Sequence, residues 1–171
     1  LLGIRYPLST EAPAGHSQMQ TLATDVDGLL GTPFVFAAVR RDTTGTSGST
    51  GNIWLTDLVV VASVGSITPT SGGIQIVTPG WYELHAWARQ AATSGTNIAM
   101  ATQIGISGSP IAQGYALAAA VSQNWTPHAR CVVQLTAGQV LQFGWTQAVA
   151  SQITFYGGSQ FNGFTARLVK K

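Results

Sequence analysis

The sequence predicts an all-β fold, a β-sandwich or jelly roll, built from about ten short strands. From Pro33 onward Gly, Val, Ile, Thr and aromatic residues dominate, and turn signals recur about every 8 to 15 residues. No helical period interrupts this region. We therefore expect strands near residues 33–40, 53–64, 74–77, 81–90, 97–106, 112–121, 129–136, 139–148, 152–156 and 161–169.

The N-terminal residues follow a different pattern. Pro7 and Pro13 disfavour regular structure and suit an extended segment. The stretch SQMQTLATDVDG then predicts a short helix with an apolar stripe of Met19, Leu22 and Val26. Because so short a helix is marginal alone in water, its stripe needs a surface to pack on. We expect residues 1–30 to be an attachment arm and residues 31–171 to be a head domain.

Charged residues are scarce in this chain. They make up 8% of it and leave a net charge of only +2, whereas 45% of the residues are hydrophobic. Residues 90–129 contain no Asp, Glu, Lys or Arg, and neither do residues 131–166. So few charges argue against nucleic acid as a partner and favour a surface that neighbouring subunits cover. No apolar run reaches the roughly 18 residues of a membrane span, so membrane insertion is not expected.

The strand expected at 81–90 has an unusual second face. Because side chains alternate along a strand, one face is an ordinary core face made of Tyr82, Leu84, Ala86 and Ala88. The other face carries Trp81, Glu83, His85, Trp87 and Arg89. Two tryptophans are too much apolar surface to leave in water without a reason. The pattern therefore predicts that this second face is covered by something.

Motifs of catalysis or cofactor binding do not stand out in the sequence. The histidines and the six acidic residues show no metal-ligand spacing and no carboxylate pair, and His128 beside Pro127 is expected in a loop. P-loop, dinucleotide and G-x-S-x-G patterns are lacking. The single cysteine, Cys131, excludes an intrachain disulfide. We therefore expect no catalytic residues, no metal site, no cofactor and no enzymatic activity.

Three motifs in chain order then carry a resemblance. A Pro-Gly turn and a Gly-x-Tyr strand are formed by Val77, Pro79, Gly80 and Tyr82. A tight strand pair contains Leu135, Gly138, Val140 and Leu141, and the closing strand contains Phe161, Gly163 and Phe164. This order resembles the complement-type globular head, the jelly roll shared with the tumour necrosis factor superfamily. Gln139 stands where that family often has Asp, which argues against a calcium site.

The arm carries a second resemblance. Its pattern of Arg-Tyr-Pro, a second Pro and a short helix with Leu-Ala-x-Asp-Val-Asp is similar to small virion proteins of tailed bacteriophages. That resemblance implies a structural role in the virion, as a minor tail or fibre protein or as a capsid decoration. The residues expected to dock on other virion proteins are Arg5, Tyr6, Pro7, Met19, Leu22 and Val26.

The head resemblance also implies a homotrimer, because such heads are generally trimeric. The covered face of the 81–90 strand would then be the subunit interface, with Trp81, His85 and Trp87 as its residues. Three copies of His85 could converge on a metal ion or a small anion at the three-fold axis, whereas a hydrogen-bonded interface histidine is the simpler alternative.

Other functions stay open at this point. A loop with aromatic and amide groups could contact a sugar ring of the host surface, and its candidate residues are Tyr115, Asn124 and Trp125. A lectin-like carbohydrate-binding module is therefore an alternative to a virion protein. An enzyme acting on glycans would need a pair of acids in a groove. The head offers only Asp42, Asp57 and Glu83 for such a pair.

Overall fold

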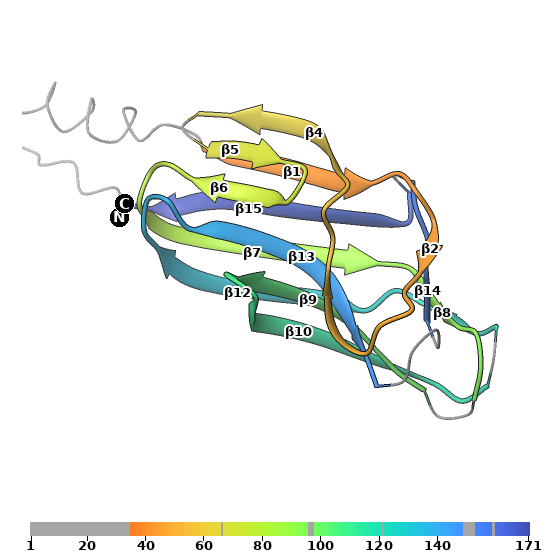
Figure 1. Ribbon diagram of the computed structural model, residues 1–171. Helices are drawn as coiled ribbons and strands as arrows, with labels where there is room; N and C mark the ends of the chain where they lie inside the picture. Colours follow the sequence, from red (N-terminus) through yellow and green to blue (C-terminus); the bar gives the residue numbers. More distant parts are fainter. Residues whose placement is uncertain (1–34, 66, 96–97, 121, 149–152, 159) are drawn as a thin grey trace, which may run out of the picture. The chain divides into compact units, whose positions relative to one another are not determined.

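A computed structural model describes residues 35–65, 67–95, 98–120, 122–148, 153–158 and 160–171 (Figure 1). The chain divides into two units, Leu1–Phe34 and Val35–Lys171, and the second unit is the head. All regular structure of the described residues is β, and every paired strand runs antiparallel to its neighbour. Among these residues no helix is long and apolar enough to cross a membrane. The predicted arm and its short helix lie outside the described residues.

Two sheets form the body of the head, and they face each other (Figure 1). The first sheet has five strands, in the order β12 (His128–Leu135), β7 (Gly80–Ala88), β15 (Asn162–Lys170), β1 (Phe36–Arg41) and β4 (Leu58–Val64). The second sheet has the order β10 (Ser109–Ala118), β9 (Ile98–Ile106), β13 (Val140–Gln147), β6 (Gly73–Ile76) and β5 (Ile67–Thr70). A further strand, β3 (Gly51–Trp54), also pairs with β13.

A small third sheet closes one end of the sandwich, opposite the end where β15 finishes (Figure 1). Its order is β11 (Asn124–Trp125), β8 (Gln90–Ala92), β14 (Ile153–Phe155) and β2 (Gly45–Thr46). Because β8 follows β7 directly along the chain, this end sheet continues the first sheet around the end of the core.

The core lies between the two large sheets and follows from the alternation of apolar residues. In β7 the predicted core residues Tyr82, Leu84, Ala86 and Ala88 are fully buried, whereas the residues between them are exposed or half-buried. The Tyr82 hydroxyl donates a hydrogen bond of 2.7 Å to the carbonyl of Thr78, so its polar end is satisfied. The predicted assignment of the two faces of this strand is confirmed.

An aromatic cluster fills the centre of the core. The rings of Phe143 and Phe164 lie 5.8 Å apart, and the ring of Phe155 lies 6.0 Å from that of Phe143. Trp145 stacks on Phe155 at 4.9 Å. These side chains come from β13, β15 and β14, so the cluster joins all three sheets. Aromatic contacts of this kind add to the burial of apolar area.

The strand boundaries differ from the predicted ones where the chain changes sheet. The stretch expected as one strand at 53–64 is two strands, because β3 pairs with β13 in the second sheet and β4 pairs with β1 in the first. The stretch expected at 81–90 likewise divides at Arg89, whose amide donates to the carbonyl of Phe161. Alternation of side chains does not reveal such a crossing, because both pieces keep a period of two.

Several short strands were not predicted from the sequence. The strand β5 contains Pro69, and β2 and β11 have two residues each, too few for a recognisable pattern. The stretch SGSP at residues 107–110 has the composition of a turn, yet β10 begins at Ser109 and includes Pro110. Proline is tolerated there because β10 is an edge strand and its pairing shifts by a bulge after Pro110.

Gly163 shows how one small residue shapes the outer face of the first sheet. It lies in β15 directly opposite Trp87 of β7. A Cβ atom at this position would lie 2.3 Å from the Cζ2 atom of the Trp87 indole. The indole therefore lies against the backbone of β15, in space that any other residue would fill. This explains the glycine of the closing motif that the sequence shows around Phe161 and Phe164.

We predict that Gly163→Ala destabilises the head by about 1–3 kcal/mol, because the new methyl group displaces the Trp87 ring or the strand. Thermal unfolding followed by circular dichroism should show a melting temperature several degrees lower. Gly48→Ala is the control, because a methyl group added there would have no atom within 4 Å. Equal melting temperatures for the two variants would contradict this account of Gly163.

Candidate functional site

The outer face of the first sheet is the part of the head that the sequence singles out. Strand register places the outward side chains of β12, β7, β15, β1 and β4 side by side. One row across the sheet contains Val132, Glu83, Arg167, Phe36 and Val64. The next contains Arg130, His85, Thr165, Ala38 and Ala62. We call this surface the tryptophan face, after Trp81 and Trp87 of β7.

Large apolar side chains are exposed on the tryptophan face. Trp81 keeps 40% of its surface exposed, Val64 keeps 48% and Val132 keeps 59%. These residues come from β7, β4 and β12, so large exposed apolar groups lie on β7 and on both edge strands of the sheet. The Glu83–Arg167 ion pair lies in the row between Val132 and Val64. Separate exposed apolar residues are ordinary on a protein surface, but a group of this extent is typical of an interaction surface.

Trp87 is held more firmly than Trp81. Its ring lies over Gly163 and is tilted against the ring of His85, with 5.0 Å between the centroids. Beside it is a small hollow of about 100 Å³, lined mainly by apolar groups of Ala38, Val61 and Phe164. Trp87 is consequently half-buried within its own subunit, and only part of it is left for a partner.

His85 is paired with a second histidine. Its Nε2 atom lies 2.9 Å from Nδ1 of His128, and the two rings stack at 5.2 Å. The expectation that His128 lies in a loop is wrong: it is the first residue of β12, where register brings it opposite Trp87. Burial lowers the pKa of His85, the charges of Arg130 and His128 lower it further, and Glu83 acts in the opposite direction.

A polar pocket of about 260 Å³ lies in the middle of the tryptophan face. It is lined by Phe36, Glu83, His85, Arg130, Thr165 and Arg167. Arg167 donates to the carboxylate of Glu83 at 2.8 Å, and Arg130 lies opposite His85 on the neighbouring strand. Sequence reasoning missed Arg130 and Arg167 as site residues, because only the register of three strands brings them beside His85.

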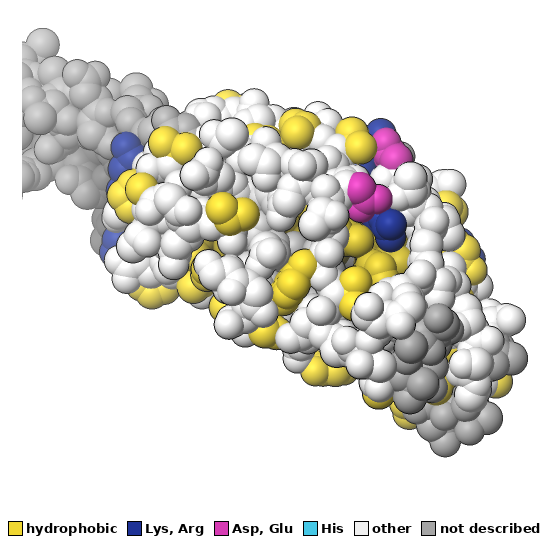
Figure 2. Space-filling model, viewed as in Figure 1, with side chains coloured by type: hydrophobic (Ala, Val, Ile, Leu, Met, Phe, Trp, Pro, Cys, Tyr) yellow, Lys and Arg dark blue, Asp and Glu magenta, His cyan; other side chains and the backbone are white. Residues whose placement is uncertain are grey.

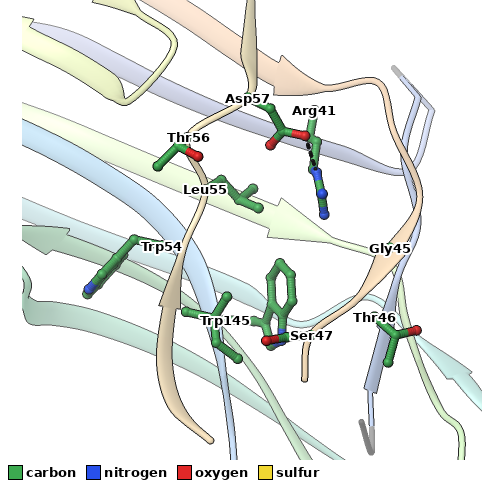
Figure 3. Close-up of a pocket in the computed structure, with 10 residues that line it drawn as sticks. Arg41, Gly45, Thr46, Ser47, Trp54, Leu55, Thr56, Asp57 and Trp145 are labelled. Atoms are coloured by element: carbon green, nitrogen blue, oxygen red, sulfur yellow. Dashed lines mark hydrogen bonds and ion pairs between the residues drawn. The ribbon is translucent and has the colours of Figure 1, made fainter. Parts of the chain in front are cut away.

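A second pocket, of about 360 Å³, lies between the chain segment around β2 and the segment that connects β3 to β4 (Figure 3). At its rim Arg41 donates from Nε to Asp57 at 2.9 Å, and Thr43 donates its hydroxyl to the same carboxylate oxygen at 2.8 Å. Burial opposes ionisation of Asp57, yet the hydrogen bonds from Thr43 and Arg41 prevail and lower its pKa.

The base of this second pocket is aromatic. Figure 3 shows Trp145 and Leu55 on the side of Arg41, whereas Trp54 points away from it. The ring of Trp54 instead covers Gly105 of β9. Nε1 of Trp145 is buried and has no hydrogen-bond partner among the described residues. No local pattern in the sequence indicates this pocket, because Arg41, Asp57 and Trp145 are far apart along the chain.

The predicted sugar-contact residues lie on different sheets. Tyr115 is in β10 of the second sheet, 64% exposed, and its hydroxyl bonds to the side chain of Gln113. Asn124 and Trp125 form β11 of the end sheet, where they pair with Ala91 and Gln90. The outer face of the second sheet is mostly uncharged in Figure 2, with scattered apolar groups. These three residues therefore remain exposed candidates without a common pocket.

The predicted docking residues Arg5, Tyr6, Pro7, Met19, Leu22 and Val26 lie outside the described residues. Within the described ranges, no group of three or more His, Cys, Asp or Glu side chains is placed to hold a metal ion.

Comparisons with known proteins bear on the fold alone. No family model and no curated protein matches this sequence. Among solved structures, the head is similar to Eiger TNF from S. frugiperda, with a TM-score of 0.59 and 10% identity over 81% of this chain and 94% of that chain. It is also similar to murine APRIL at pH 8.0, with a TM-score of 0.57 and 10% identity over 80% of this chain and 99% of that chain. The predicted tumour necrosis factor-like jelly roll is thus confirmed as the fold of the head.

Proposed function

We propose that the head is a non-enzymatic homotrimer whose subunits associate through the tryptophan face. The observation that carries this proposal is the set of large exposed apolar side chains on three strands of the first sheet, Val132 of β12, Trp81 of β7 and Val64 of β4. Covering the exposed part of Trp81 alone would contribute roughly 2 kcal/mol per subunit, from about 25 cal/mol per Å². The likeness of the fold to TNF-type jelly rolls is consistent with such an assembly.

The scarcity of charge supports the same proposal. Residues 131–166 contain no charged side chain, although they include β13 and most of β12. A free monomer with so few charges is weakly protected by charge repulsion against non-specific association. A defined oligomer would cover part of this uncharged surface. Interfaces are also rich in aromatic residues at their centre, and Trp81 and Trp87 give the tryptophan face that character.

We further propose that the trimer belongs to the virion of a tailed bacteriophage, as a minor tail or fibre protein. The support is the similarity of residues 1–30 to the N-terminal segment of such proteins, with the docking residues named above. Three arms on one trimer would bind the particle with the avidity of linked sites. A capsid decoration that stabilises the shell is the alternative within this class, because the same arm and head would serve both roles.

A carbohydrate-binding, lectin-like module is the second candidate function. The pocket between β2 and the segment that connects β3 to β4 favours it, because a carboxylate, a guanidinium and the polar residues Ser47 and Thr56 line one hollow (Figure 3). Its volume lies in the range of small-molecule sites, and a few fixed polar groups above an aromatic base are typical of them. In a virion protein, such a site would contact a glycan of the host surface.

We predict that Trp81→Glu converts the trimer to a monomer, because a large exposed apolar side chain is lost and three carboxylates would be removed from water between the subunits. Light scattering at low micromolar concentration should give three times the chain mass for the native protein and the mass of one chain for the variant. Trp87→Glu should act in the same direction.

Tyr115→Glu is the matched control for these variants, because Tyr115 is an exposed aromatic residue on the other sheet. It should leave the trimer intact. A native chain that is monomeric, or a trimer that Tyr115→Glu dissociates as readily as Trp81→Glu does, would refute the proposed interface.

We predict that antibodies against the head label purified phage particles. In particles from a phage whose gene lacks codons 1–30, the label should be lost while the truncated chain remains trimeric. Gold label at the tail would support the minor tail or fibre role, and label over the shell would support decoration. Particles that carry no label in either case would exclude the virion role.

We predict that Asp57→Asn weakens the binding of a monosaccharide at the second pocket by about tenfold or more, because a hydrogen bond to a charged group is lost. Saturation-transfer NMR against a panel of monosaccharides would identify and rank the ligands. Asp42→Asn is the control, because that carboxylate pairs with Arg40 outside the pocket lining. A panel without any binder would remove the lectin-like candidate at this pocket.

A further inference from the structure

The pocket on the tryptophan face is a cationic site without a counter-charge for one of its arginines. Arg130 and Arg167 both line it, together with His85. Arg167 is paired with Glu83 at 2.8 Å. No carboxylate among the described residues lies within ion-pairing distance of Arg130. Its five guanidinium donors are therefore available to an acceptor that enters the pocket.

The acids of the head cannot supply that acceptor without breaking other pairs. Residues 35–171 contain only Asp42, Asp57 and Glu83 as acidic side chains. Asp42 pairs with Arg40 at 2.6 Å and Asp57 pairs with Arg41 at 2.9 Å, so all three carboxylates already have an arginine of their own subunit. In a trimer of heads, a neighbouring subunit would bring a further Arg130 and no unpaired acid of its own.

Burial of Arg130 in the interface would then be costly. A charged group that is removed from water without a partner strongly destabilises a structure, and pairing with hydrogen bonds offsets much of that cost. Arg130 lies directly opposite His85, on the edge strand β12 of the proposed contact. The face can therefore close over it if an anion enters from solution, if one of the acids outside the head (Glu11, Asp25 or Asp27) pairs with it, or if the guanidinium stays at the wet rim.

Geometry and chemistry of the lining suit an oxyanion. Guanidinium groups bind phosphate, sulfate and carboxylate groups through paired N–H donors. Since Nε2 of His85 is engaged with His128, the Nδ1 atom of His85 is left as a further donor in the tautomer that carries its proton there. The volume of about 260 Å³ accommodates an oxyanion with several waters, each of which takes about 30 Å³.

Other groups around His85 set the balance of charge in the pocket. His128 and Arg130 are cationic or can become so, and they lie on β12. The carboxylate of Glu83 on β7 would repel an anion, but its charge is compensated by the ion pair with Arg167 on β15. The pKa of His85 is lowered by burial first and then by Arg130 and His128, which is the response of a group in a pocket that already has excess positive charge.

We propose that Arg130, with His85 and Arg167, binds a small oxyanion of the sulfate, phosphate or carboxylate type, and that this anion neutralises Arg130 when the tryptophan faces associate. The second part rests on the proposed trimer, whereas the first part stands without it. The anion would act as a cofactor of assembly, so that subunits associate more strongly where such ions are plentiful.

The binding test uses the full chain with inorganic sulfate as probe, since sulfate keeps its charge between pH 5 and 8. NMR signals of His85 are followed during pH titrations in sulfate and in chloride at equal ionic strength. The chain has three histidines, so assignment is simple. A bound anion favours imidazolium, so the pKa of His85 should rise in sulfate and sulfate should bind more tightly as pH falls through that pKa. Acetate in place of sulfate tests a carboxylate as the ligand.

Variants separate a specific site from general screening. Arg130→Gln should abolish the sulfate effect on His85, and Arg130→Lys should restore part of it. Arg40→Gln is the control, because it removes the same charge from the same sheet outside this pocket. An unchanged His85 titration in sulfate, or an equal response in native chain and Arg130→Gln, would overturn the proposed site.

The assembly test measures chain mass by sedimentation in the same buffers. In the native chain, sulfate should lower the concentration at which trimer forms by tenfold or more relative to chloride. Arg130→Gln should form trimer equally in both buffers, because a neutral side chain needs no counter-ion. A native trimer that is indifferent to sulfate would overturn the assembly role and leave the proposed trimer standing. A monomer in every buffer, with sulfate bound at Arg130, would instead refute the trimer and keep the site.

Discussion

The pairing of β7 with β12 on one side and β15 on the other is the constraint on which the rest of the head depends. This register places Tyr82, Leu84 and Ala86 in the core. It also determines which polar groups meet on the outside. A shift by one residue would move every core side chain of β7 to the outer face. Because burial of the core side chains opposes that shift, the same register also fixes the positions of His85, Arg130 and Arg167 relative to one another on the outer face. No strong interaction among these three residues is needed to hold them there.

The space above Gly163 is part of the same constraint. Only a glycine lets the indole of Trp87 lie against the backbone of β15. There the indole contacts the ring of His85, which in turn contacts His128. The glycine thus allows the Trp87 ring to pack on the sheet, the ring of His85 packs against the indole, and the ring of His128 packs against that of His85. These aromatic groups are therefore held in place without any partner. Preorganisation of this kind lowers the entropic cost of association.

Charged side chains are few in the head, and most of the arginines have a partner that compensates their charge. Each acidic side chain is paired with an arginine of the same subunit. Arg89 lies over the rings of Tyr156 and Phe161 at about 5 Å, where a cation–π contact replaces a carboxylate. Arg130 has neither kind of partner among the described residues. The surface with the largest exposed aromatic residue of β7 therefore also carries a positive charge that no carboxylate of the described residues compensates, and this combination is the basis of the proposed link between assembly and ions in solution.

Much of the fold was determined by the sequence itself. The many short strand and turn signals predicted a β-sandwich or jelly roll, and alternation assigned both faces of β7, because burial imposes a period of two on each strand. The choice of the jelly roll came from the resemblance of three motifs to the complement-type head. The same local rules named Trp81, His85 and Trp87 as surface groups. Only the tertiary structure decided that the chain changes sheet at residues 55–57 and at Arg89, and that His128 begins a strand. It also decided that Arg130 and Arg167 lie beside His85 and that Arg41, Asp57 and Trp145 surround one pocket. These are contacts between residues distant in the chain, and they depend on strand order and register, which no local pattern encodes.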